Sequence, residues 1–172
     1  MFNKLTQPEV CFACHKTQRA QIRRFSRHPI AEGKVTCSNC HNPHGSTGPT
    51  LLVKNSVNET CYTCHAEKRG PFLWEHAPDV DDCTNCHTPH GSNLSPLLKM
   101  RSPMLCQSCH SGDHGKNLYS GANLPSGNVT TVNGRLPLAS QNPPAQGNYR
   151  GCLNCHSQVH GSNHPAGAKF QR

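Results

Sequence analysis

Residues 83–110 read CTNCHTPHGSNLSPLLKMRSPMLCQSCH, and residues 37–65 read CSNCHNPHGSTGPTLLVKNSVNETCYTCH. Both stretches begin with Cys-x-Asn-Cys-His-x-Pro-His-Gly-Ser, continue through a Leu-Leu pair and a lysine, and end in a second Cys-x-x-Cys-His motif. A sequence that repeats itself at this length is built from supersecondary units that recur along the chain. The motif that recurs within these stretches is therefore the main determinant of how the chain folds.

The Cys-x-x-Cys-His motif occurs six times and uses all twelve cysteines. Numbered from the N-terminus, the motifs are CFACH at 11–15, CSNCH at 37–41, CYTCH at 61–65, CTNCH at 83–87, CQSCH at 106–110 and CLNCH at 152–156. This motif is the sequence cue for c-type haem attachment, in which the two thiols add to the haem vinyl groups and the imidazole binds the iron. The sequence predicts six haem c groups.

Each motif assigns its residues two kinds of role. The predicted thioether-forming cysteines are Cys11, Cys14, Cys37, Cys40, Cys61, Cys64, Cys83, Cys86, Cys106, Cys109, Cys152 and Cys155. The predicted proximal iron ligands are His15, His41, His65, His87, His110 and His156.

Seven further histidines lie outside the motifs, whereas the chain has only three methionines, too few for methionine ligation of every iron. The predicted distal ligands are His28, His44, His76, His90, His114 and His160, with His164 as a spare or an alternative. A histidine close to its own motif cannot easily fold back onto the same iron, so we expect it to ligate a neighbouring haem. Bis-His ligation closes both axial positions, which favours electron relays over catalysts.

The composition excludes an ordinary globule, because hydrophobic residues make up 33% of the chain against roughly 45–50% in typical soluble domains. We expect the porphyrins to form the core of a mostly irregular, elongated multihaem cytochrome c with a few short α-helices and no significant sheet. The best helix candidates are residues 8–15 and 16–25, and Pro-His-Gly should stop any helix after the second and fourth motifs. The net charge of +8 offsets the haem propionates, so we predict no nucleic-acid partner.

The repeat predicts a single hexahaem domain of three two-haem repeats, at about 8–54, 55–102 and 103–172. Residues 116–150, rich in Asn, Gly and Pro, are interpreted as an inserted loop. No apolar run reaches the length of a transmembrane helix, and the first residues have no signal-peptide core. Because haem c is attached outside the cytoplasmic membrane, we expect a periplasmic or outer-membrane-associated protein whose precursor carries a signal peptide.

The order Cys-x-x-Cys-His, His-Pro, Cys-x-x-Cys-His-x-Pro-His-Gly resembles the periplasmic decahaem cytochromes of outer-membrane electron conduits, of the Mtr type and the dimethyl-sulfoxide-respiration type. GPFLWEHAP at 70–78 and RGCLNCHSQVHGSNHPAG at 150–167 carry the likeness best. The resemblance implies bis-His haems, partial insertion in an outer-membrane β-barrel porin, and partner cytochromes as electron donor and acceptor. The chain departs from that family by having six motifs instead of ten.

Function is therefore predicted to be electron transport across the periplasm or outer membrane to an extracellular acceptor or partner cytochrome, without enzymatic activity. Two settings compete with the porin-embedded conduit: a soluble periplasmic shuttle and a self-associating extracellular filament. A multihaem reductase would need one haem with an open axial position. A zinc protein is the remaining alternative, but a Cys₄ site gives no reason for histidine after each second cysteine.

Overall fold

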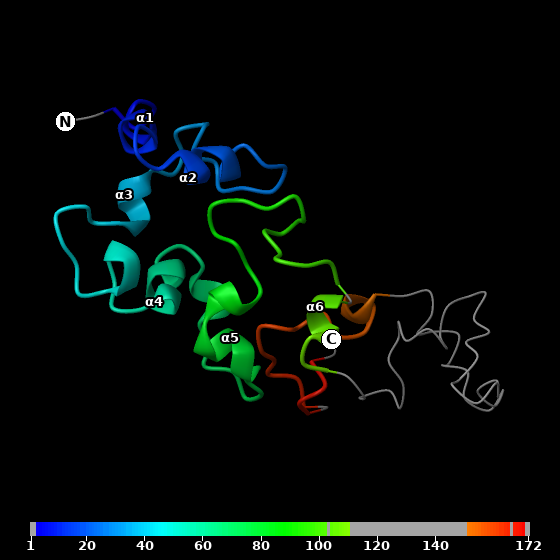
Figure 1. Ribbon diagram of the computed structural model, residues 1–172. Helices are drawn as coiled ribbons and strands as arrows, with labels where there is room; N and C mark the ends of the chain where they lie inside the picture. Colours follow the sequence, from blue (N-terminus) through cyan, green and yellow to red (C-terminus); the bar gives the residue numbers. More distant parts are fainter. Residues whose placement is uncertain (1–2, 103, 111–150, 166, 171–172) are drawn as a thin grey trace, which may run out of the picture.

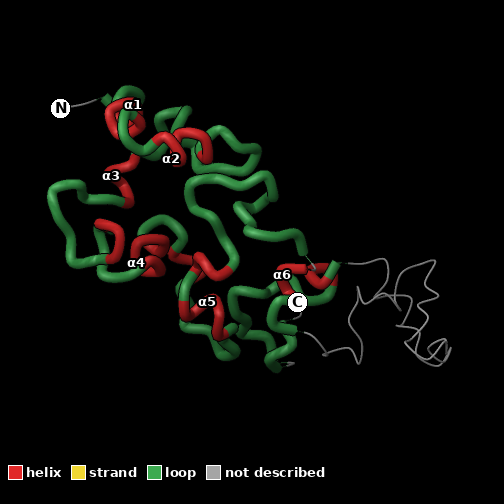
Figure 2. Tube along the Cα trace, viewed as in Figure 1, coloured by secondary structure: helices red, strands yellow, loops and turns green. Residues whose placement is uncertain are grey.

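The computed structural model describes residues 3–102, 104–110, 151–165 and 167–170. In that part, short helices alternate with irregular segments and no strand occurs (Figures 1 and 2). The α-helices are α1 (Gln7–Phe12), α2 (Lys16–Gln21), α3 (Cys37–Cys40), α4 (Val57–Tyr62), α5 (Ala77–Asp81) and α6 (Met104–Gln107). The 3₁₀ helices are η1 (Pro49–Leu51), η2 (Ala66–Lys68), η3 (Cys83–Asn85) and η6 (Cys152–Asn154). The predicted mostly irregular fold with few short helices is confirmed.

The helices are short because most of them are built around the single turn that a Cys-x-x-Cys-His motif forms. In all six motifs the histidine N–H donates a hydrogen bond to the carbonyl of the first cysteine, at 2.8–3.0 Å. That spacing is one turn of an α-helix, which presents the residues of the motif together. The inserted loop predicted at 116–150 lies outside the described residues.

Helix α2 ends at Gln21, earlier than the predicted end at residue 25. The chain that follows leaves the helix because it pairs with a distant segment. Ser26 and Ser92 form an antiparallel bridge, with both N–H···O distances at 2.8 Å. In Figure 1 the segment that follows the fourth motif accordingly runs beside the segment after α2.

A second bridge of the same kind joins Trp74 and Ser162, with both N–H···O distances at 2.9 Å. It brings the segment after the sixth motif beside the segment that leads into α5 (Figure 1). The two bridges thus tie chain segments that are far apart in sequence. Main-chain pairing, more than side-chain packing, places the motifs relative to one another.

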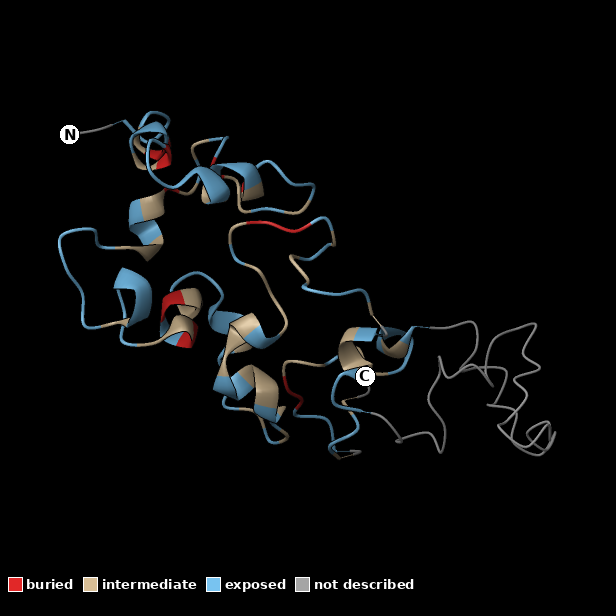
Figure 3. Ribbon diagram, viewed as in Figure 1, coloured by how far each residue is buried: buried red, intermediate tan, exposed pale blue. Residues whose placement is uncertain are grey.

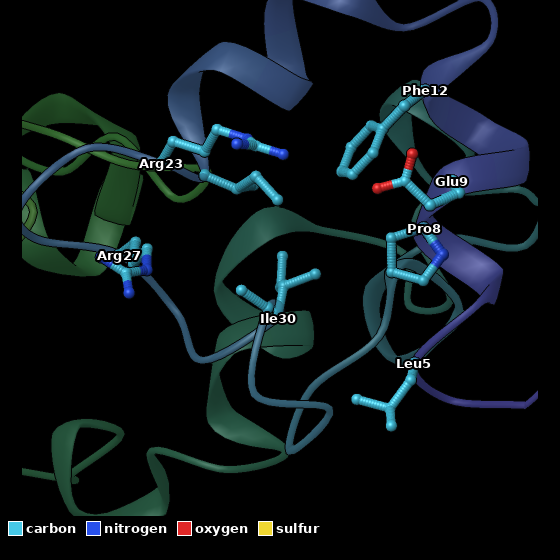
Figure 4. A pocket seen from close by; sticks show the side chains of 9 residues that line it. Leu5, Pro8, Glu9, Phe12, Arg23, Arg27 and Ile30 are labelled. Atoms are coloured by element: carbon cyan, nitrogen blue, oxygen red, sulfur yellow. The ribbon is translucent and has the colours of Figure 1, made fainter.

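The hydrophobic core of the described residues is small. Phe12, Ile22, Ile30 and Leu52 are its buried apolar residues, and Figure 3 shows how little of the ribbon is buried. The first three line a cavity of about 400 Å³ next to α1 (Figure 4). Among the described helices, none is long and apolar enough to cross a bilayer.

Candidate haem sites

The six motifs follow one another in space in their sequence order. Their first cysteines meet in pairs within hydrogen-bonding reach: Cys11 with Cys37, Cys61 with Cys83, and Cys106 with Cys152. Cysteines of the second and third motifs interact electrostatically, as do those of the fourth and fifth. Each motif therefore has its sequence neighbours as its spatial neighbours.

None of the twelve cysteines forms a disulfide with another, so the predicted thioether roles conflict with no other bond. Burial is the main cause that raises the pKa of the Cys37 thiol to about 11, and the nearby Cys11 adds to it. The hydrogen bond between Cys61 and Cys83 lowers the pKa of the Cys61 thiol and raises that of Cys83. Within the described residues, no group of three or more Cys, His, Asp or Glu has metal-site geometry.

Three proximal histidines are oriented by the main chain. The Nδ1 atom of His41 lies 2.9 Å from the Thr50 carbonyl oxygen. The Nδ1 atom of His87 lies 2.8 Å from the Pro96 carbonyl oxygen. His156 has its Nδ1 atom 2.5 Å from the Lys169 carbonyl oxygen. Because a carbonyl can only accept, each Nδ1 carries the proton and Nε2 keeps the lone pair that a metal needs.

Four of the predicted distal histidines lie opposite proximal histidines. The ring-centre separations are 6.3 Å for His28 and His65, and 6.1 Å for His41 and His90, His76 and His110, and His87 and His160. A metal–imidazole bond is about 2 Å long and the ring centre lies about 1 Å behind the nitrogen, so an iron between two imidazoles holds their centres about 6 Å apart. The residues present fit a six-coordinate haem iron.

In every pair, the distal histidine faces a motif two places away from the motif that it follows in the sequence, and we call this the rule of two motifs. His90 and His160, which follow the fourth and sixth motifs, face backward to the second and fourth. His28 and His76, which lie in the spacers after the first and third motifs, face forward to the third and fifth. We call the first kind edge histidines and the second kind spacer histidines. Each pair therefore links two separate segments of the chain.

The surroundings of the two edge histidines, His90 and His160, favour the neutral imidazole. Burial is the main cause that lowers the pKa of His160 to about 4, and it also lowers the pKa of His90. A neutral imidazole has a lone pair for a metal at ordinary pH. His28 has its Nδ1 atom 2.7 Å from the Pro89 carbonyl oxygen, which leaves Nε2 directed toward the third motif.

The other predicted distal ligands are placed differently. His44 is exposed, and no imidazole among the described residues stands opposite its ring. His114 lies outside the described residues. His164 accepts a hydrogen bond at its main-chain carbonyl from Trp74 Nε1, at 3.0 Å.

Two serines that sequence reasoning missed hold the edge histidines in place. Ser92 and Ser162, two residues after His90 and His160, form the bridges to Ser26 and Trp74. Both serines are buried, although serine is usually exposed. The repeated His-Gly-Ser sequence marks both serines, but by itself it indicates only a turn and not the segment with which each serine pairs.

Residues 28–70 and 76–115 match the family described as doubled CXXCH motif. The chain is also 52% identical, over 173 residues, to a protein of Shewanella baltica (strain OS185) named multiheme cytochrome MtrA. That match covers 100% of this chain and 48% of the relative, so the chain spans about half the length of that relative.

Proposed function

This chain belongs to the Mtr family of multihaem c-type cytochromes, and we propose that it relays electrons along six covalently bound, low-spin haem c groups. The resemblance that the sequence predicted is thereby confirmed. The observation that carries the proposal is the set of four imidazole pairs about 6 Å apart. Each haem supplies an iron that cycles between the ferric and ferrous states.

Every motif attaches one haem through its two cysteines and ligates the iron through its histidine. The second axial ligands are His90 for the second motif, His28 for the third, His160 for the fourth and His76 for the fifth. This assignment rests on the ring separations and on the main-chain bonds that orient His41, His87 and His28. His114 and His164 stay the candidates for the sixth motif.

Electrons pass between haems without substrate at the iron, since paired imidazoles close both axial positions. The proximity of first cysteines, such as Cys61 and Cys83, would hold the haems of successive motifs next to one another, so that electron transfer would follow the order of the motifs. We therefore propose a relay and not an enzyme. The family further implies an extracytoplasmic location, partner cytochromes as donor and acceptor, and a porin as scaffold.

The test combines spectroscopy with transport. The matured protein is expected to carry six haems by intact mass and to show bis-His low-spin spectra for the haems of the second to fifth motifs. Reconstituted with an outer-membrane porin of its own organism in liposomes, it should reduce a dye trapped inside when an external donor is added. If the trapped dye stays oxidised even with the porin present, the soluble shuttle is favoured, and electron transport only in self-associated fibres would favour the filament. Fewer than six haems, or high-spin iron at these four motifs, would contradict the assignment.

A further inference from the structure

We propose that Asp79 sets the reduction potential of the haem held by the fourth motif, and that its carboxylate places this potential below that of the equivalent haem of the second motif. The relay then contains an internal step between two haems that have the same ligand arrangement. The inference rests on the proposed bis-His ligation. It arises because the two sites share their imidazoles but differ in the charges beside them.

The second and fourth motifs have equivalent ligands. The ring centres of His41 and His90 are 6.1 Å apart, as are those of His87 and His160. In both sites the Nδ1 atom of the proximal histidine bonds to a main-chain carbonyl, at 2.9 and 2.8 Å. Identical axial ligands with identical supporting bonds predict similar potentials. The surrounding charges are then the feature that separates the two haems.

A carboxylate lies beside the fourth motif. The Oδ1 atom of Asp79 is 4.0 Å from the Nε2 atom of His160, and the Asp79 side chain is only 14% exposed. This distance is too long for a hydrogen bond, and a nitrogen that ligates iron has no proton to donate. Asp79 is also within electrostatic reach of His87 and of both cysteines of the motif, Cys83 and Cys86. It therefore acts on this site through its charge.

Helix α5 fixes the place of Asp79. The Asp79 N–H donates to the His76 carbonyl at 2.9 Å, and the Asp79 carbonyl accepts from Asn58 Nδ2 at 2.9 Å. The nearest cation is Lys68, which acts on both Asp79 and His160. Its Nζ atom lies 4.0 Å from the Glu67 carboxylate, and both of these side chains are exposed. Solvent screens such an exposed pair, so the half-buried carboxylate dominates.

The second motif has the opposite surroundings. The groups that act electrostatically on His90 are His41, His28 and His15, and no ion pair of the described residues includes His90. A cation lies close instead, because Arg24 Nη1 donates to the carbonyl of Gly91 at 3.3 Å. The distal side of this site therefore faces a positive charge where the fourth motif faces a negative one.

The repeat itself shows that Asp79 is an addition to the second repeat. Asp79 is the third residue after the spacer histidine and the fourth before the first cysteine of its motif. In the first repeat these two places belong to Ala31 and Gly33, neither of which carries a charge. The contrast between the two sites is thus built into the sequence.

A fixed charge changes a reduction potential by favouring one oxidation state. Ferric iron has one positive charge more than ferrous iron, so a nearby carboxylate stabilises the ferric state and a nearby guanidinium disfavours it. Asp79 consequently keeps the fourth site oxidised at potentials where the second is already reduced. An electron that reaches the fourth site from a ferrous neighbour moves uphill, so Asp79 limits how many electrons the relay holds at this point.

The test is a spectroelectrochemical titration of the haem-loaded chain. Burial raises the pKa of the Asp79 carboxyl, so the buffer is mildly alkaline and the carboxylate carries its charge. D79N should raise the equilibrium constant for reducing one haem by about tenfold, which is about 59 mV for a one-electron couple. D79E keeps the charge and should keep the original potential. The matched control is D81N, which removes an exposed carboxylate from the same helix and should shift every step less.

Carbon monoxide identifies the haem that shifts. H160A opens the fourth haem and H90A opens the second, and carbon monoxide then holds the opened haem in the ferrous state and removes its step from the titration. The step that H160A removes should lie at a lower potential than the step that H90A removes. In the H160A background under carbon monoxide, D79N should move no step more than D81N does.

The proposal is overturned by any of three results. These are a D79N shift no larger than that of D81N, a D79N shift that persists when the fourth haem is held ferrous, and a step removed by H160A at a potential equal to or above that removed by H90A. If H160A or H90A creates no haem that binds carbon monoxide, the bis-His assignment itself fails. The two failures are therefore distinguishable.

Discussion

At the residue scale, the glycines that follow His44 and His90 distinguish the cost of backbone strain from the cost of close packing. Gly91 and Gly45 both have positive φ, at 152° and 131°, so alanine is strained at either position. Only at Gly91 would the new Cβ also collide with the main chain, at Gln21. In the isolated holoprotein we expect Gly91→Ala to lower the free energy of unfolding by about 1–3 kcal/mol more than Gly45→Ala. Chemical denaturation followed by haem absorbance measures the difference, and equal losses would contradict the packing argument.

The sequence predicted which imidazoles are candidate ligands, but not which motif each one faces. The repeat made His28 and His76 equivalent, and it made His44 and His90 equivalent. Their partners depend on the bridge between Ser26 and Ser92 and on its counterpart at Trp74 and Ser162. Such pairing joins segments with no shared periodicity, so nothing in the local sequence encodes it. Only the three-dimensional structure identifies the motif that each distal histidine faces.

At the scale of elements, Asn58 fastens α4 to the helices that follow it. Its Nδ2 donates to the carbonyls of Asp79 and Val80, at 2.9 and 3.0 Å, and its Oδ1 accepts from the Cys83 N–H at 2.8 Å. The side chain is 6% exposed. This clamp holds the third and fourth motifs at the distance that brings Cys61 and Cys83 together.

Replacement of Asn58 by alanine removes the three hydrogen bonds that its buried side chain forms with Asp79, Val80 and Cys83. Because main-chain groups are left without these partners, we expect Asn58→Ala to lower the free energy of unfolding by about 1–3 kcal/mol. The matched control is Asn55→Ala, at an exposed residue whose amide accepts one hydrogen bond from Thr47. Thermal unfolding of the haem-loaded variants gives the comparison. A loss as small as that of the control would show that the clamp is dispensable.

The helices themselves were largely predictable, because proline and the motif set their limits. α1 begins beside Pro8, and Pro-His-Gly prevents α3 from continuing, as the sequence indicated. The early end of α2 was not predictable, since a tertiary pairing at Ser26 overrides local helix propensity. The clamp by Asn58 was equally hidden, because an asparagine inside a helix usually reads as a solvated residue.

At the scale of the whole molecule, the polypeptide lacks the apolar interior that would fold it alone. Phe12, Ile22, Ile30 and Leu52 are the only buried hydrophobic residues of the described part, whereas Phe25 is 80% and Leu73 is 66% exposed. Such a chain cannot offset its conformational entropy by side-chain burial. The composition predicted that few apolar side chains would be buried, and the structure shows which ones are. The covalent haems are the natural source of the missing contacts.

We therefore expect the chain produced without haem attachment, with its thiols reduced, to be unfolded. Ligands that bind only the folded state contribute their binding energy to folding, as structural zinc does in small domains. Small-angle scattering should then give a radius of gyration near the about 44 Å of an unfolded chain of this length, far above the about 16 Å of a compact one. Circular dichroism of the same sample should show no cooperative thermal transition. A compact apoprotein that melts cooperatively would mean that main-chain bridges and clamps such as Asn58 suffice to hold the fold, and that the haems enter a preformed scaffold.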